Sequence, residues 1–227
     1  MRNRLLAVVI AAALAVVLWP PGSAQANHSS GYHWARTANP FTVEFEDNVT
    51  SAWDSYLNTA ANDWTQSTIL DTVVLRGSFG SKSCRPNPGH VEVCNSTYGN
   101  TGWLSIAQIW VTGGNHITQA SVKLNDTYLS SPPYNTPAWH QLLMCQEIGR
   151  TLGLSLQDTN ASNPNLGSCM DFTSNPSGPP SNEHPNQHDY DELVSIYTHF
   201  DAVNTTMSVL RAGKAAGTDV ITYVTWA

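Results

Sequence analysis

Four cysteines, in a chain that begins like an exported protein, limit the ways in which this sequence can fold. They are Cys84, Cys94, Cys145 and Cys169. An even number of cysteines in an oxidising compartment favours disulfides, and no C-x-x-C spacing supports a four-cysteine zinc site. Three pairings are open to four cysteines. Because Cys84 and Cys94 flank a Pro/Gly turn followed by alternating residues, we predict a disulfide-linked hairpin there, which leaves Cys145 to pair with Cys169.

The N-terminal segment has the three parts of a secretory signal. Two arginines precede an apolar run from Leu5 to Leu18, and the small-x-small triplet Ala24-Gln25-Ala26 follows it. The apolar run is shorter than the ~20 residues that span a bilayer, and helix-breaking residues end it. We therefore predict that residues 1–26 are a cleaved signal peptide. The mature protein is then expected to be secreted to the extracellular space, with no membrane anchor.

Charge argues against one class of partner. The chain has 10 Lys and Arg against 17 Asp and Glu, a net charge of −7. Cleavage after residue 26 would remove two arginines and no acidic residue. Since an acidic surface without a basic cluster repels phosphate backbones, we do not expect binding to nucleic acid.

Hydrophobic periodicity predicts an α+β fold, in which helices pack against a mixed sheet. Alternating or β-branched segments predict strands at 41–47, 69–77, 103–111, 117–125 and 219–226. Apolar residues three and four positions apart predict a helix over about 51–66, with Ser51 as its N-cap, and a final helix over 188–200. We assign residues 27–200 to one domain and leave 201–227 as a C-terminal tail without an assigned role.

A third predicted helix has signals at both ends. Thr136 can cap its N-terminus, and Pro137 fits the first helical turn. Gly153 can adopt the left-handed conformation that ends helices. A long polar loop follows, from about 157 to 187, and loops of this length are seldom without a function.

The segment that ends this helix, "MCQEIGRTLGLSLQD" (144–158), resembles the active-site helix of metzincin zinc endopeptidases, in particular the matrixin-like secreted ones. That family carries H-E-x-x-H-x-x-G-x-x-H and, further along, a methionine-containing turn beneath the metal. Glu147 matches the general base, Gly153 matches the glycine that turns the chain, and Met170 in "SCMD" matches the methionine turn. The resemblance covers about residues 40–200.

The resemblance implies a twisted mixed sheet, an active-site-type helix, the methionine turn and a C-terminal helix. It also implies that the strand at 117–125 is the edge strand, which lies antiparallel to bound substrate in the family. The family's cofactor is zinc and its reaction is hydrolysis of peptide bonds.

All three positions that hold zinc-binding histidines in the family differ here. Gln146 offers only a weak carbonyl oxygen, Arg150 has no lone pair and a permanent positive charge, and Leu156 offers no ligand atom. Catalytic zinc is held by three nitrogen, thiolate or carboxylate donors plus water. We therefore expect the zinc of the family not to bind at this helix. Arg150, three residues after Glu147, is expected to pair with it in the vacant cavity; the alternative is that both face solvent.

These observations leave three hypotheses for function. The first is a catalytically inactive metallopeptidase homologue whose cleft still binds an extended peptide or protein segment by strand addition. The second is a working endopeptidase that holds zinc through Gln146 and outside donors such as His184 or His188. The third is a disulfide-linked structural domain without a ligand. The sequence contains no G-x-S-x-G, phosphate-binding loop or dinucleotide-binding motif.

Overall fold

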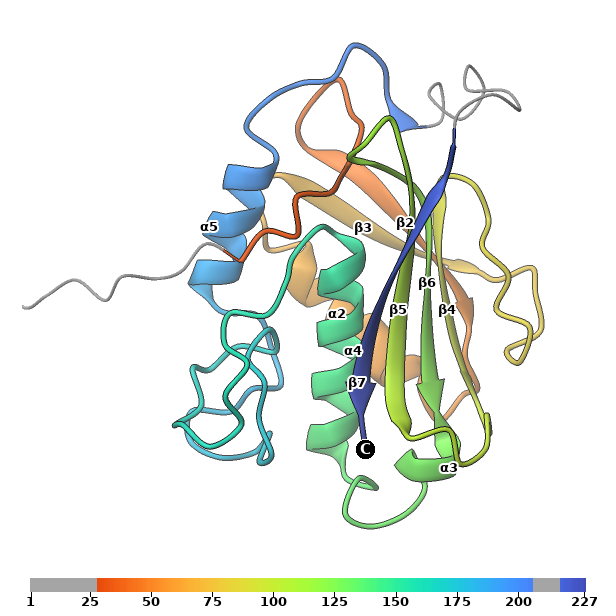
Figure 1. Ribbon diagram of the computed structural model, residues 1–227, viewed down its shortest axis with the longest axis vertical. Helices are drawn as coiled ribbons and strands as arrows, with labels where there is room; N and C mark the ends of the chain where they lie inside the picture. The colour runs from red at the N-terminus through yellow and green to blue at the C-terminus, as the bar shows by residue number, and fades with distance from the viewer. Residues whose placement is uncertain (1–27, 206–216) are drawn as a thin grey trace, which may run out of the picture.

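One mixed β-sheet forms the centre of the protein, with helices on one side of it (Figure 1). The computed structural model describes residues 28–205 and 217–227, so the predicted signal peptide lies outside the described residues. The strands are β1 (His33–Trp34), β2 (Phe41–Asn48), β3 (Leu70–Arg76), β4 (His90–Ser96), β5 (Trp103–Thr112), β6 (His116–Asn125) and β7 (Asp219–Trp226). The helices are α2 (Asp54–Trp64), α3 (Asp126–Leu129), α4 (Pro137–Thr151) and α5 (Gln187–Ile196). Within the described ranges, no helix is long and apolar enough to cross a membrane.

The sheet order is β3-β2-β4-β6-β5-β7, and β1 pairs with the beginning of β6. Strands β2, β3, β4 and β6 run parallel to their neighbours in that set, whereas β5 is antiparallel to both β6 and β7. Helices α2 and α4 pack on the sheet and against each other. The predicted α+β class is confirmed.

The core lies between the sheet and these two helices. On α2, Leu57, Ala60 and Trp64 are fully buried, and they belong to the same apolar cluster as Val43 and Phe45 of β2. Full burial of a large apolar side chain contributes roughly 1.5–3 kcal/mol each. The helix begins at Asp54, and its N-cap position is Trp53 without a side-chain cap, so the predicted Ser51 cap is wrong.

The ends of α4 are as the sequence predicts. The Thr136 hydroxyl accepts a hydrogen bond from the Trp139 backbone N–H (3.3 Å), and Pro137 is the first helical residue. Gly153 has φ +102°, and a Cβ atom at this position would lie 2.3 Å from the carbonyl oxygen of Tyr32. Only glycine fits there, because both the backbone conformation and the close approach exclude a side chain.

The final helix differs at both ends from the prediction. It spans Gln187–Ile196 rather than 188–200. Asn186 caps it: its side chain accepts from the backbone N–H groups of His188 and Asp189, and the Asp189 carboxylate accepts from the Asn186 N–H. This reciprocal capping box satisfies N–H groups that have no partner inside the helix.

The predicted hairpin between Cys84 and Cys94 is wrong, although these two cysteines form a disulfide. Cys84 lies in the loop before β4, and Cys94 lies within β4. Both edges of β4 are already paired, to β2 on one side and to β6 on the other, and both pairings are parallel. The disulfide therefore ties a loop to a central strand.

The predicted edge strand at 117–125 is also wrong. This segment is most of β6, which lies between β4 and β5. The antiparallel strand next to α4 is β5, and its outer edge is covered by β7 from the C-terminal segment (Figure 1). The strand predicted at 219–226 is confirmed, so the sheet extends beyond the predicted domain boundary at residue 200.

Candidate functional site

Helix α4 brings three polar residues of the metzincin-like motif into the interior. Glu147 is fully buried, and Gln146 and Arg150 are almost so. Each lies on a helix enclosed by the sheet, by α2 and by the loop that carries Met170. Burying a charge without partners is costly, so the contacts of these side chains determine what the site can do.

The Glu147 carboxylate is surrounded by hydrogen-bond donors from three elements. Its Oε1 atom accepts from the Ser105 hydroxyl of β5 (2.6 Å) and from the Thr225 hydroxyl of β7 (2.8 Å). Arg150 Nη1 lies 3.2 Å from Oε1 and 3.1 Å from Oε2. The predicted ion pair is present and both partners are buried. Two hydroxyl groups and one guanidinium therefore enclose the Glu147 carboxylate.

Arg150 also contacts the C-terminal strand. Its Nη1 lies 3.2 Å from the Thr225 hydroxyl oxygen, and its guanidinium carbon lies 5.6 Å from the centre of the Tyr223 ring. A guanidinium against an aromatic face is stabilised by the ring's electron density. Arg150 thus links α4 to β7 as well as neutralising Glu147.

The Gln146 amide has a partner at each end. Its Nε2 atom donates to the carbonyl oxygen of Cys169 (3.0 Å), and its Oε1 atom lies 3.1 Å from the Thr225 hydroxyl. Leu156, at the third position of the motif, is half-buried in the segment after α4. These residues do not fit zinc. The guanidinium of Arg150 lies against Glu147, and the one amide oxygen, that of Gln146, already faces a hydroxyl group.

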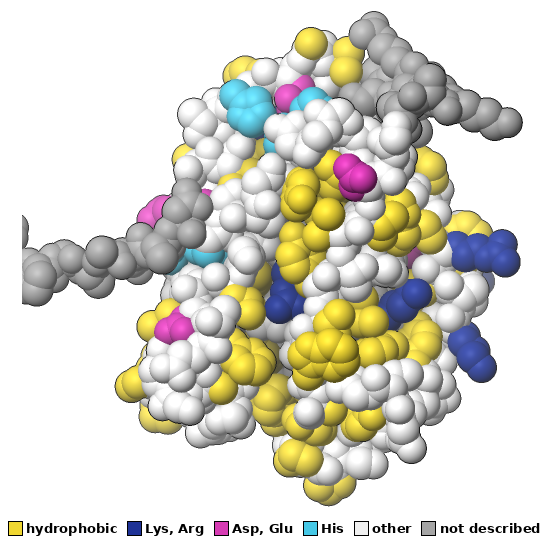
Figure 2. Space-filling view, in the orientation of Figure 1, with side chains coloured by type: hydrophobic (Ala, Val, Ile, Leu, Met, Phe, Trp, Pro, Cys, Tyr) yellow, Lys and Arg dark blue, Asp and Glu magenta, His cyan; other side chains and the backbone are white. Residues whose placement is uncertain are grey.

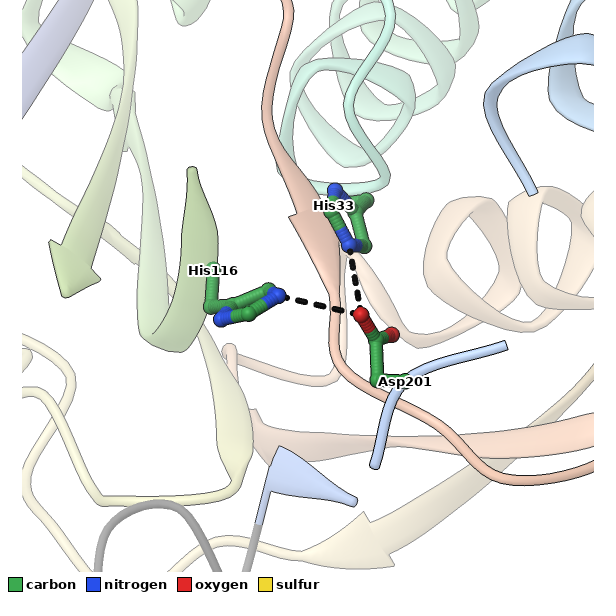
Figure 3. Close-up of side chains that lie close together, drawn as sticks. All are labelled: His33, His116 and Asp201. Atoms are coloured by element: carbon green, nitrogen blue, oxygen red, sulfur yellow. Dashed lines mark hydrogen bonds and ion pairs between the residues drawn. The ribbon is translucent and has the colours of Figure 1, made fainter. Parts of the chain in front are cut away.

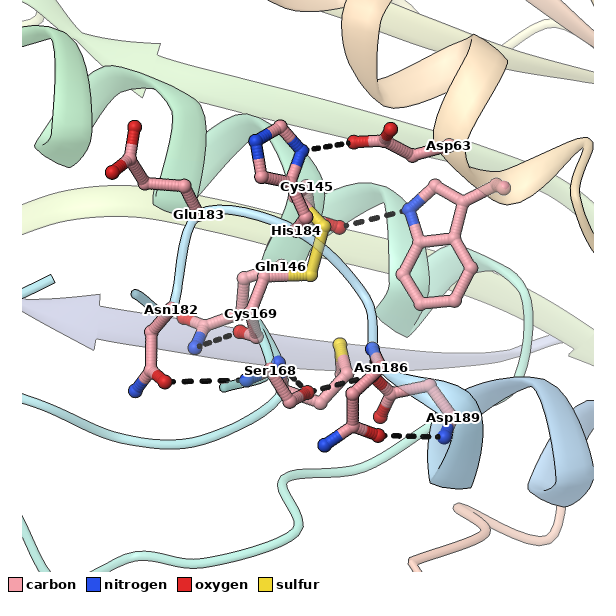
Figure 4. The surroundings of a disulfide bond; sticks show 12 residues. Asp63, Cys145, Gln146, Ser168, Cys169, Asn182, Glu183, His184, Asn186 and Asp189 are labelled. Carbon is pink, nitrogen blue, oxygen red and sulfur yellow. Dashed lines mark hydrogen bonds and ion pairs between the residues drawn. A yellow bond between two sulfur atoms is a disulfide. The ribbon is translucent and has the colours of Figure 1, made fainter. Parts of the chain in front are cut away.

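The methionine-containing turn lies beneath α4 and is held by a disulfide (Figure 4). Cys145 of α4 is bonded to Cys169 of the turn. The next residue, Met170, is fully buried; a Cβ atom on Gly149 would lie 2.6 Å from its sulfur. The turn and the helix are therefore in direct contact at a glycine.

A buried polar network fixes the turn to α5. The Ser168 hydroxyl donates to Asp189 Oδ2 (2.6 Å) and accepts from the Met170 N–H (2.8 Å). Asn182 Oδ1 accepts from the backbone N–H groups of Gly167 and Ser168 (2.9 and 3.2 Å), as Figure 4 shows for Ser168. Burial raises the pKa of Asp189 to about 6, although hydrogen bonds from Ser168 and Asn186 oppose the shift.

The two histidines considered as outside zinc donors do not join the α4 residues. His184 Nδ1 lies 2.7 Å from Asp63 Oδ2 at the surface, on α2 (Figure 4). The His188 ring lies 5.0 Å from that of His28. Across residues 28–205 and 217–227, the one group of three or more candidate metal ligands includes neither of them and does not include Glu147.

Sequence reasoning missed Ser105 and Thr225. Thr225 lies 78 residues from Glu147 along the chain, and Ser105 lies 42 residues away. Both are ordinary strand residues, and no motif marks a hydroxyl that will be buried against a carboxylate. Only the pairing of β7 with β5, beside α4, brings them to this site.

Comparison with known proteins gives little further information. No protein-family model and no curated protein matches this chain. Thirty-three chains of solved structures match. One is described as the crystal structure of myroilysin; it is 11% identical, the match covers 80% of this chain and 89% of that chain, and the TM-score is 0.37. This is a distant structural likeness.

Proposed function

We propose that this protein is a secreted, catalytically inactive metzincin-like protein that binds an extended peptide segment along β5. In the unbound protein, its own strand β7 occupies that position. The observation that carries the proposal is the contact of the Thr225 hydroxyl of β7 with Glu147 and Gln146 of α4.

The contacts of Glu147 support the loss of catalysis. A general base in a zinc peptidase needs a metal-bound water, because zinc lowers the pKa of that water from about 15.7 to about 7. Here Glu147 accepts hydrogen bonds from two hydroxyls and pairs with a buried guanidinium. The motif residues Gln146, Arg150 and Leu156 supply no adequate set of ligands.

The pairing of β7 supports peptide binding. It is antiparallel to β5 from Trp103–Trp226 to Val111–Asp219, and main-chain hydrogen bonds of this kind are sequence-tolerant. Most side chains of β7 are exposed or half-buried, and only Thr225 is buried. A displacing segment would therefore need a β-strand conformation and one small hydroxyl residue.

The surface around β7 is apolar. Val220 and Trp226 are 48% and 64% exposed, respectively. In Figure 2, hydrophobic side chains gather over the region where Figure 1 places β7 and β5. An exposed apolar strip beside a sheet edge is typical of a surface that receives a partner segment.

A peptide-exchange experiment tests the proposal. The full chain with Ile221→Pro and Thr222→Pro should weaken β7, because successive N–H groups of a strand point to opposite edges, so that one of these two prolines removes an N–H directed at β5. A fluorescent peptide with the sequence of residues 219–227 should bind this variant at least about tenfold more tightly than the wild type, measured by anisotropy, because the resident strand no longer competes. The control peptide carries lysine in place of threonine at the position of Thr225.

Two results would contradict the proposal. Failure of the proline variant to bind the peptide, or equal binding of the lysine control, would favour a structural domain without a peptide site. Cleavage of an unfolded protein that Glu147→Gln abolishes would restore an active metalloendopeptidase.

A further inference from the structure

Three histidines and one aspartate from separate parts of the chain converge at one place, far in sequence from α4. His33 lies on β1, and His116, its register partner, begins β6. His199 and Asp201 follow α5. We call these four residues the histidine–aspartate cluster. Figure 3 shows His33 and His116 pointing at the same carboxylate oxygen of Asp201.

Ligand atoms of His33, His116 and Asp201 all lie within 4.8 Å of one another, and His199 lies beside His33 and Asp201. The Nε2 atoms of His33, His116 and His199 lie 3.4, 3.1 and 3.6 Å from Asp201 Oδ1. The Nε2 atoms of His33 and His199 are 3.1 Å apart. Zinc bonds of ~2.0–2.1 Å in a tetrahedron place neighbouring ligand atoms about 3.3–3.4 Å from one another.

Hydrogen bonds alone do not account for this arrangement. Each Nε2 atom carries either one proton or one lone pair. If His33 Nε2 donates to Asp201, it has no lone pair with which to accept from His199. If His199 donates to His33, it has no proton for Asp201. A cation at the centre instead uses the lone pairs of all four atoms at once.

Of the two carboxylate oxygens of Asp201, Oδ1 is the one that faces the histidines. Its Oδ2 atom accepts from the Arg36 backbone N–H (3.0 Å), and its own N–H donates to the Arg36 carbonyl (2.8 Å). Contacts of this kind orient a ligating carboxylate around a metal. His33 and Asp201 are largely buried, whereas the His199 side chain is 53% exposed, so an ion can enter from solvent.

We propose that the histidine–aspartate cluster is a structural zinc site. Because three of the four donors are imidazole nitrogens, the set suits Zn²⁺ better than Mg²⁺ or Ca²⁺, which prefer oxygen ligands. With the exposed His199 side chain turned toward the ion, four protein ligands would fill a tetrahedral shell and leave no position for substrate or reactive water. The ion would tie β1, the β5–β6 turn and the segment after α5 together. This site is independent of α4, and neither proposal depends on the other.

Metal content of the full chain tests the site. After dialysis against metal-free buffer following zinc loading, the wild type should retain about one zinc ion per chain by elemental analysis. His116→Ala and His199→Ala should each reduce the retained zinc to background. His184→Ala is the matched control, because His184 is equally exposed and also faces a carboxylate, and it should keep the ion.

Two further measurements test whether zinc binds at the histidine–aspartate cluster itself. Zinc at 100 times its Kd should raise the melting temperature of the wild type by about 5–10 °C. The same zinc concentration should not change the melting temperature of His199→Ala. Cobalt in place of zinc should give the intense visible absorption of a tetrahedral site in the wild type. Wild-type protein that retains no zinc, or retention by both His116→Ala and His199→Ala, would overturn the assignment.

Discussion

The hydroxyl group of Thr225 lies 2.8 Å from Oε1 of Glu147, and this contact joins the C-terminal strand to the central helix α4. It adds a third side chain to the two, Ser105 and Arg150, that also contact the Glu147 carboxylate. The contacts from β5, β7 and α4 make Glu147 part of a buried polar core.

Replacing Arg150 tests the energetic role of the buried ion pair. Arg150→Met leaves the fully buried Glu147 carboxylate without its counter-charge, and such a change costs about 3–5 kcal/mol of unfolding free energy. The measurement is urea denaturation at pH 7. Glu147→Gln combined with Arg150→Met should recover much of the loss, because the uncompensated charge is then absent.

The control for this change is Arg76→Met at an exposed position of β3. It should alter the unfolding free energy by no more than about 0.5 kcal/mol. An equally small effect of Arg150→Met would contradict the role assigned to the guanidinium.

Replacing Thr225 tests the attachment of β7. Thr225→Val keeps the shape of the side chain but leaves Glu147 and Gln146 facing a methyl group, which should cost about 1–3 kcal/mol. Amide hydrogen exchange should show faster exchange in β7 specifically. Val220→Thr, at an exposed position of the same strand, is the control and should leave the unfolding free energy and the amide exchange of β7 nearly unchanged.

The pH dependence of stability is expected to depend on Glu92. This residue is fully buried on β4 opposite Glu46 of β2. Burial, then hydrogen bonding with Glu46 and its charge, raises the pKa of Glu92 from 4.5 to about 8. Between these values the folded state binds more protons than the unfolded state. The stabilising contribution is therefore complete below about pH 4.5 and is lost as pH rises toward 8.

The measurement is the unfolding free energy of the wild type and of Glu92→Gln at several values between pH 5 and 8. The difference in unfolding free energy between the wild type and Glu92→Gln should change with pH by up to about 1.4 kcal/mol per pH unit. Asp191→Asn, at an exposed position, should leave the wild-type slope intact. Parallel curves for wild type and Glu92→Gln would show that Glu92 does not titrate in this range.

Gly149 tests the contact between α4 and the methionine-containing turn. Alanine in place of glycine normally favours a helix by about 1 kcal/mol. Here the new Cβ atom would lie 2.6 Å from Met170 Sδ and 2.7 Å from the Trp64 ring. Overpacking of a core costs about 1–3 kcal/mol, so Gly149→Ala should destabilise the protein. Thermal unfolding measures this effect.

A second substitution separates steric strain from a backbone effect. Met170→Ala in the Gly149→Ala background removes the closest atom, so the double variant should be more stable than the sum of the two single changes predicts. Additive losses would show that the sulfur does not limit the space at Gly149.

Several features could be predicted because they depend on neighbouring residues alone. The limits of α4 follow from a Thr136 cap and from Gly153, and the β2 and β7 strands follow from alternation or β-branched content. The Glu147–Arg150 pair follows from spacing along one helix. Each of these signals is contained in a few consecutive residues, and local conformation is sufficient to produce it.

The wrong predictions concern which β-strands pair with each other in the sheet. A turn-like sequence between Cys84 and Cys94 predicts a hairpin, but β4 instead pairs with two strands from elsewhere. The position of 117–125 at a sheet edge was inferred by resemblance, and β6 is internal. Strand order depends on competition among all strands for partners, and no short pattern records the outcome.

By itself, the sequence determined the α+β fold class and the limits of α4, and it placed no strong metal-ligating side chain at positions 146, 150 and 156. Tertiary structure alone decided that β7 fills the edge of β5, that Thr225 and Ser105 enclose Glu147, and that His33, His116, His199 and Asp201 meet. The physical reason is that, apart from the neighbouring His199 and Asp201, these contacts join residues 42 to 168 positions apart. Such contacts form only when the whole sheet assembles, since loop-closure entropy must first be offset by burial of the core.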